Sequence, residues 1–215
     1  MADLNSIATL ATAGGTLVLA VATFSATRSA NRSARVAEEA LKVGVRPVLF
    51  NARPQDAPQR VGYVDDHWVQ LRDGLSAVQE HEENLYVSIP LRNVGPGLAV
   101  LHGWHLWTER QGSRVHPLDV ETFRRHTRDL YVPAGDIGFW QAAVRDAEDP
   151  LYSPALESIR ARRGMSVDVL YSDHEGGQRT VTRFFLYPRP AEEEDPWLWT
   201  CSTVSHWNID RPDPR

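Results

Sequence analysis

The sequence is poor in cysteine, because Cys201 is the only one among 215 residues. A single thiol excludes an intrachain disulfide framework and any structural zinc site built from several thiolates. Basic charge is not in excess either, since the formal net charge is -5 and the pI is near 5.9. Nucleic-acid-binding proteins usually offer a basic surface to the phosphates, so this composition argues against a nucleic-acid partner.

Motifs for cofactor binding and catalysis are also missing. Gly95 and Gly97 in "NVGPGLAV" follow a predicted strand, but the third glycine and the helix that receive a pyrophosphate are lacking. A turn with glycines at positive φ is predicted there instead. The stretch "HEGGQ" from His174 ends in Gln178, where a zinc-protease helix needs histidine. We therefore predict no cofactor, no metal and no catalytic residue.

Charge is absent from Ser6 to Ala26, after a short N-terminal end at residues 1–5. About 20 uncharged residues are enough for a helix to cross roughly 30 Å of hydrocarbon. A transmembrane helix is therefore predicted over residues 6–26. A cleaved signal peptide and a buried helix of a soluble protein are the alternatives. The signal peptide is disfavoured because Asp3, and no lysine or arginine, precedes the run.

Three arginines, Arg28, Arg32 and Arg35, follow the uncharged run. Positively charged residues that flank a span are retained on the cytoplasmic side. The sequence thus predicts a single-pass protein of the cell membrane, with its N-terminus outside and its domain in the cytoplasm.

Residues 27–45 are predicted to continue as an amphipathic helix, with the three arginines on one face and alanines on the other. The arginine face is either a solvated topology signal or a contact for anionic lipid head groups. The alanine-rich face, with Ala11 and Gly15 in the span, would let helices approach closely in a homo-oligomer.

From residue 46 to residue 208, apolar residues recur with the period of two that is typical of strands. Short strands are separated by clusters of glycine, proline and aspartate, and alternating long helices are missing. We predict a mainly β fold, an antiparallel immunoglobulin-like β-sandwich. The clearest strand has one apolar face, formed by Leu85, Val87, Ile89 and Leu91.

Three segments interrupt this pattern. One short helix is predicted near residues 153–163, capped by Ser153. Pro54 to Glu83 is polar, offers one short candidate strand around Trp68, and is predicted to be the most mobile part of the domain. Residues 209–215 are predicted to form a disordered tail.

Tryptophans supply the candidate partner-binding aromatics. Trp197, Trp199 and Trp207 are predicted to share one face of the last strand with Cys201. They either fill the core or form an exposed platform for a partner. Cys201 among them is predicted to be an inert buried thiol.

Four polar residues in strands and loops are weak candidates for a ligand site: His102, Asp173, His174 and His206. His105 lies three residues after His102, so on a regular strand the two side chains point to opposite faces and do not share a metal ion.

The order of parts, an uncharged span, an arginine-rich helix ending in "GVRPVL" and a strand closing with "LRNVGPGLA", resembles a loose group of uncharacterised bacterial single-pass membrane proteins with a small immunoglobulin-like domain. The resemblance covers the first half of the chain. It implies architecture and location, and no activity.

Two functions are therefore weighed. The first is a membrane-anchored, non-catalytic β-sandwich interaction module that binds a protein partner or itself. The alternative is a small-ligand binder or enzyme whose site is assembled from sandwich loops. Convergence of the candidate polar residues in one cavity would favour the alternative. Their dispersal, together with an exposed apolar patch elsewhere, would favour the interaction module.

Overall fold

A computed structural model describes residues 2–190 and 195–211, and the chain divides between Gly44 and Val45 into two compact units. The first unit is one long helix, and the second is a mainly β domain. The predicted succession of an apolar N-terminal helix and a mainly β domain is confirmed.

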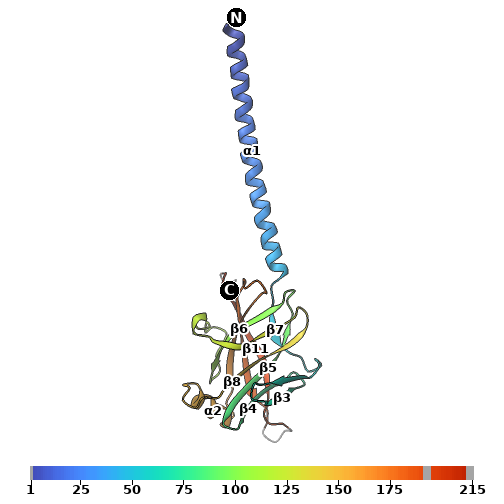
Figure 1. Ribbon diagram of the computed structural model, residues 1–215, viewed down its shortest axis with the longest axis vertical. Helices are drawn as coiled ribbons and strands as arrows, with labels where there is room; N and C mark the ends of the chain where they lie inside the picture. Colours follow the sequence, from blue (N-terminus) through green and yellow to red (C-terminus); the bar gives the residue numbers. More distant parts are fainter. Residues whose placement is uncertain (1, 191–194, 212–215) are drawn as a thin grey trace. The chain divides into compact units, whose positions relative to one another are not determined.

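Helix α1 (Ala2–Gly44) runs without a break (Figure 1), and all of its described side chains are exposed. The hydroxyls of Thr12, Thr16 and Thr23 each donate to the carbonyl four residues earlier, at 2.8–2.9 Å. These bonds satisfy polar groups that would otherwise be costly in hydrocarbon. In the described part of the chain, α1 is the one helix long and apolar enough to cross a membrane.

Within its described residues, the β domain contains eleven strands, one α-helix and one 3-10 turn. The strands are β1 (Leu49–Asn51), β2 (Gln59–Gly62), β3 (Trp68–Leu71), β4 (Ser76–His81), β5 (Asn84–Asn93), β6 (Ala99–Trp107), β7 (Arg124–Val132), β8 (Ile137–Val144), β9 (Met165–Ser172), β10 (Thr180–Pro188) and β11 (Leu198–Asn208). The helix is α2 (Tyr152–Arg160), and the 3-10 turn is η1 (Val120–Thr122).

Nine of the strands form one antiparallel sheet in the order β1-β5-β4-β11-β10-β9-β6-β7, with β8 on the other edge of β5. The sheet curls around a common core (Figure 1). Its two ends, β7 and β8, touch each other, but no ladder joins them in the described part of the chain. Hydrogen bonds therefore connect one curled sheet rather than the two separate sheets of the predicted sandwich.

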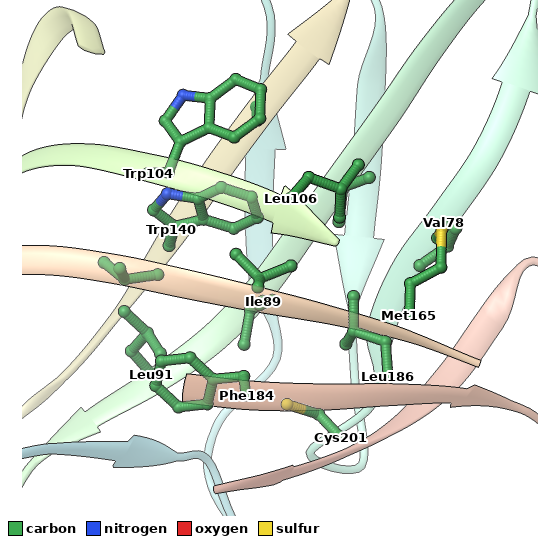
Figure 2. Close-up of a cluster of buried hydrophobic side chains, with 14 of the residues drawn as sticks. Val78, Ile89, Leu91, Trp104, Leu106, Trp140, Met165, Phe184, Leu186 and Cys201 are labelled. Carbon is green, nitrogen blue, oxygen red and sulfur yellow. The ribbon is translucent and has the colours of Figure 1, made fainter. Parts of the chain in front are cut away.

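The main core lies inside this curl and is filled by large side chains such as Trp140, Met165 and Phe184, each at most 1% exposed (Figure 2). The predicted apolar face of β5 belongs to it: Leu85, Val87, Ile89 and Leu91 are at most 4% exposed. At about 25 cal/mol per Å² of apolar surface, this burial is the main stabilising contribution to the fold.

The opposite face of β5 is buried as well, which the sequence did not indicate. Strands β2 and β3 pair as a separate hairpin and cover Tyr86 with Val61, Val69 and Leu71. The prediction that residues 54–83 hold one short strand is wrong, because β2, β3 and β4 all lie there. Strands of four to six residues show few alternations and do not stand out from a polar loop.

The "NVGPGLAV" segment is a close backbone crossing rather than a positive-φ turn. Neither Gly95 nor Gly97 has a positive φ, but a Cβ on Gly97 would lie 1.7 Å from the carbonyl oxygen of Val45. The Asn93 amide, which is fully buried, holds the crossing: Nδ2 donates to the carbonyl of Gly97 at 2.6 Å, and Oδ1 accepts from the amide of Val48 at 3.1 Å. The motif is thus structural.

Helix α2 occurs where a helix was predicted, but it begins at Tyr152 without a side-chain cap, so Ser153 is not its N-cap. The beginning of the predicted tail is held by the fold. The amide of Ile209 donates to the carbonyl of Arg179 at 2.9 Å, and Asp210 pairs with the same arginine. Residues 212–215 of that prediction lie outside the described residues.

Candidate functional site

Two β-bulges decide which side chains meet on the outer face of the sheet. In β6 the register shifts between Leu101 and Gly103, so His102 is an extra residue. His102 and His105 consequently lie on the same side of the sheet, around Phe123. The prediction that they point to opposite faces is wrong, because an extra residue reverses the alternation.

The second bulge separates the tryptophans of β11. Trp199 lies in the main core with Cys201, whereas Trp207 packs on the other face with Phe123 and Val181. The bulge lies between Thr203 and Ser205 and moves Trp207 to that face. Trp207 is 5% exposed, and Trp197 lies in the turn before β11, partly buried. The predicted shared face is therefore wrong, and no exposed platform results.

Cys201 lies in the core, whereas Trp68 lies on the surface. Burial raises the pKa of the Cys201 thiol to about 12, which fits an inert core residue. The exposed tryptophan is Trp68 of β3, which sequence reasoning did not select as a partner-binding aromatic. Its ring covers Gly62, and the guanidinium of Arg60 lies 4.3 Å from the ring centroid.

His102 lines a cavity of about 330 Å³ with Phe123, Leu170, Arg125 and Arg179. Its Nε2 lies 2.6 Å from the hydroxyl of Ser172, which itself donates to the carbonyl of Asp173. His102 must then donate this bond, because the Ser172 proton is already used. Burial, and then the charge of Arg179, lower the pKa of His102, which keeps the ring neutral.

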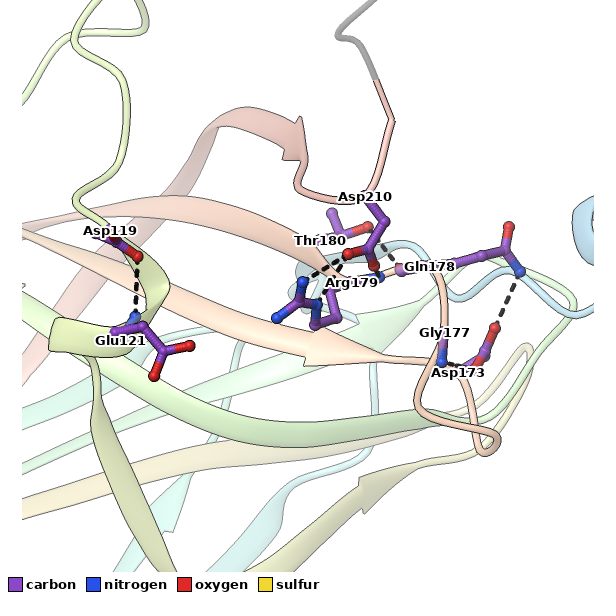
Figure 3. A network of polar contacts seen from close by, with 8 residues as sticks. All are labelled: Asp119, Glu121, Asp173, Gly177, Gln178, Arg179, Thr180 and Asp210. Carbon is purple, nitrogen blue, oxygen red and sulfur yellow. Dashed lines mark hydrogen bonds and ion pairs between the residues drawn. The ribbon is translucent and has the colours of Figure 1, made fainter.

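The other ligand candidates do not join His102 in this cavity. Asp173 is buried and shapes its own turn, accepting from the amide of Gly177 and the side chain of Gln178 at 3.0 Å (Figure 3). His174 is exposed, and the Nδ1 of His206 lies 2.7 Å from the hydroxyl of Thr182. Among the described residues, no three histidine, cysteine or acidic side chains could hold a metal ion.

A buried ion pair anchors the loop at residues 108–123, which covers part of the outer face of the sheet. Asp168 and Arg183 are fully buried, and the arginine donates to both carboxylate oxygens at 2.6 Å. Its Nη1 also donates to the carbonyls of Gly112 and Val115. The signal in the sequence was a charge in the middle of each of two apolar strands, which sequence reasoning did not weigh.

A further cluster of polar side chains lies between β7 and β8, the two ends of the curled sheet. We call it the seam groove: a hollow of about 240 Å³ between β7 and β8, with an apolar floor that includes Trp104, Leu130 and Ala142. Four arginines line it, three from β7 and one that directly follows β8: Arg124, Arg125, Arg128 and Arg145.

Acidic partners balance only part of this charge. Arg124 pairs with Asp149, and Arg145 pairs with Asp65. Arg128 donates to the amide oxygen of Gln141 at 2.8 Å, and within the described ranges neither it nor Arg125 forms an ion pair. Two positive charges of the groove are therefore uncompensated, so the groove is suited to a negatively charged group.

Two buried nitrogen atoms lie beside this groove without a hydrogen-bond partner in the part of the chain that the structure describes, His126 Nε2 and Trp140 Nε1. The two rings are 6.4 Å apart between centroids. Burial, followed by the charges of His102 and Arg128, lowers the pKa of His126 to about 4. Because buried polar atoms are nearly always bonded, two unmet ones together mark a place where a polar ligand group could bind.

We expect acidification to destabilise the domain through His126. Its pKa falls from 6.5 to about 4 on folding, so the unfolded chain binds the proton first. The stabilisation is present above pH 6.5 and is lost as the pH falls toward 4, by up to about 2 kcal/mol at pH 5. Guanidinium unfolding at pH 7 and pH 5 should show a smaller loss for His126→Gln than for the unsubstituted chain. His174→Gln, at an exposed turn, is the control, and an unchanged loss in His126→Gln would contradict the assignment.

Comparison of the chain with protein-family models, with curated proteins and with solved structures finds no match. The resemblance to bacterial single-pass membrane proteins therefore stays a prediction.

Proposed function

We propose that this protein is a membrane-tethered, non-catalytic module that binds a protein partner through the seam groove. The observation that carries the proposal is the groove itself, in which two uncompensated arginines, Arg125 and Arg128, rim an apolar floor. Interfaces are enriched in arginine and aromatic side chains that combine both kinds of contact. The dispersal of His102, Asp173, His174 and His206 supports binding rather than catalysis.

The tether in this proposal is α1, which crosses the membrane over residues 6–26. The back-bonded threonines and the exposed apolar side chains support it. Arg28, Arg32 and Arg35 are exposed at the helical spacing of one face, which supports contact with anionic lipid head groups and a cytoplasmic domain. Self-association through the alanine-rich face is compatible with its exposure.

We propose that the fold is a relative of the immunoglobulin-like sandwich in which one curled sheet takes the place of two sheets. Opposite halves of the curled sheet enclose one core, as the two sheets of a sandwich do. This arrangement supports the resemblance to single-pass proteins with such a domain.

Cysteine labelling in intact cells tests the orientation. With Cys201 replaced by serine, cysteine is introduced at Ala2 or at Gly177, an exposed turn residue. A membrane-impermeant maleimide should label position 2 at once and position 177 only after lysis. Labelling of position 177 in intact cells would overturn the cytoplasmic placement.

Site-specific photocrosslinking of the full-length chain in its own membrane tests partner binding. A photoreactive residue at Thr127, exposed on the groove, should give a discrete protein adduct. Charge reversal by Arg125→Glu with Arg128→Glu should abolish the adduct. The matched control carries the photoreactive residue at Arg114, in the exposed loop before η1. The absence of any groove adduct, or one that survives charge reversal, would refute the proposed function.

A further inference from the structure

We propose that the partner presents an extended acidic segment that pairs as an added strand with the free edge of β8. This inference rests on the proposed function, since it names what occupies the same groove. Three features of the groove indicate this occupant: an open backbone edge, an uncompensated positive charge and an apolar floor.

The backbone edge of β8 is regular and open. All eight residues, Ile137–Val144, are in register with β5 along one edge, from Arg92 back to Leu85. In an antiparallel pair, alternate residues bond to the neighbour, and the residues between them point their N–H and C=O groups the other way. Those groups of β8 face the groove, where the described residues supply no ladder partner. An open edge of this kind is a template for an added strand.

Strand β7 does not fill this position because it bends away from regular pairing. It pairs with β6 at Arg124 and Arg125 and again from Leu130 to Val132. The four residues between, 126–129, lie opposite the bulge at His102 and pair with neither strand. Gly138 of β8 is close to Val132 at the turn end of the seam, so the groove opens toward the end that holds Arg124 and Arg145.

Charge selects an acidic occupant. Arg125 and Arg128 have no ion pair among the residues described, and Arg124 and Arg145 face the same hollow. Side chains on one face of a strand recur about every 7 Å, so alternate glutamates of a docked segment could reach successive arginines of the rim. The unmet nitrogen of His126 can bond a backbone amide or carbonyl of that segment, according to its tautomer.

Apolar residues of the segment would alternate with the acidic ones. They would face the floor at Trp104 and Leu130 and the exposed side chain of Val64 at the rim, which is 77% exposed. The recognised segment is therefore short and strand-forming, with acidic and apolar residues in alternation.

Fluorescence anisotropy with the full-length protein in detergent micelles tests this inference. The probe is a fluorescein-labelled peptide of about eight residues that alternates glutamate and valine. A lysine-for-glutamate peptide should bind at least ~10-fold more weakly. Two N-methylated versions block alternate sets of backbone amides, and only the set that faces β8 should abolish binding.

Variants and amide exchange locate the bound peptide. Arg125→Gln with Arg128→Gln should weaken binding ~10-fold, whereas Arg110→Gln, at an exposed arginine over the ring of Phe185, should leave it unchanged. Hydrogen exchange of alternate β8 amides, those not bonded to β5, should slow at least ~10-fold in the complex. Equal effects of both N-methylated peptides, or equal binding of the lysine peptide, would overturn the inference.

The two proposals fail in different ways. A charge-dependent adduct at Thr127, together with peptide binding that ignores backbone methylation, would keep the proposed function and remove strand addition. Absence of any adduct at Thr127 in the unsubstituted groove, or an adduct that survives charge reversal, would remove both. A third outcome is binding of the protein to vesicles that contain anionic lipid. If Arg125→Gln with Arg128→Gln abolished this binding and the acidic peptide did not displace it, the groove would be a membrane contact, and the inference would also be overturned.

Discussion

Replacing Asp168 by asparagine is expected to lower the free energy of unfolding by about 3–5 kcal/mol, because it leaves the buried charge of Arg183 without its counter-charge. Both side chains are 0% exposed, and Trp107 Nε1 donates a further bond to the carboxylate at 3.0 Å. Asparagine keeps the size of the side chain and accepts with only one oxygen. The measurement is guanidinium unfolding of the full-length chain at pH 7, followed by tryptophan fluorescence.

A matched control separates burial from ion pairing as such. Asp65→Asn breaks the pair with Arg145, whose side chains are 28% and 38% exposed, and should cost less than about 1 kcal/mol. Asp168→Leu combined with Arg183→Met should recover much of the loss, since an apolar pair of similar size carries no desolvation penalty. Equal losses in Asp168→Asn and Asp65→Asn would show that the buried pair does not hold the loop at residues 108–123.

Gly97→Ala is expected to destabilise the domain by about 3 kcal/mol or more, because the new methyl group would collide with backbone. An ideal Cβ at this position lies 1.7 Å from the carbonyl oxygen of Val45 and 2.3 Å from its carbonyl carbon, so backbone atoms rather than the end of a flexible side chain would have to shift. A shift of Gly97 away from Val45 would also break the hydrogen bond that Asn93 Nδ2 donates to the Gly97 carbonyl. Thermal or guanidinium unfolding measures the loss.

Gly112→Ala is the control for this prediction. No atom lies within 4 Å of a Cβ built on Gly112, and the residue is exposed, so its substitution should stay within about 0.5 kcal/mol of zero. If Gly97→Ala were equally mild, the "NVGPG" crossing would have to be more open than the structure shows.

The predictions that rest on local chemistry are the ones that the structure bears out. An uncharged run of about 20 residues followed by arginines predicts a long helix, and α1 extends over all of it. The alternation of Leu85, Val87, Ile89 and Leu91 correctly marked a core face of β5. A charge inside the apolar stretches around Asp168 and Arg183 was also visible, although which charge meets which depends on the register of β9 and β10.

Other predictions failed because one inserted residue in a strand reverses the side of the sheet on which all later side chains of that strand lie. The bulge at His102 brought two histidines to one side of the sheet, and the bulge between Thr203 and Ser205 parted Trp207 from Trp199. The alternation of apolar and polar residues along a strand does not show where one extra residue is inserted. The burial of Tyr86 likewise required the β2–β3 hairpin to fold over β5.

The sequence by itself determined the division into an apolar helix and a β domain, since hydrophobic period and charge are local properties of the chain. Only the tertiary structure decided where the sheet ends meet and which arginines lack acidic partners. Arg125 and Arg145 are 20 positions apart in the numbering and lie on opposite sides of one hollow. That proximity arises from the curl of the sheet and the irregular path of β7, which depend on long-range pairing and therefore cannot be read from any single segment.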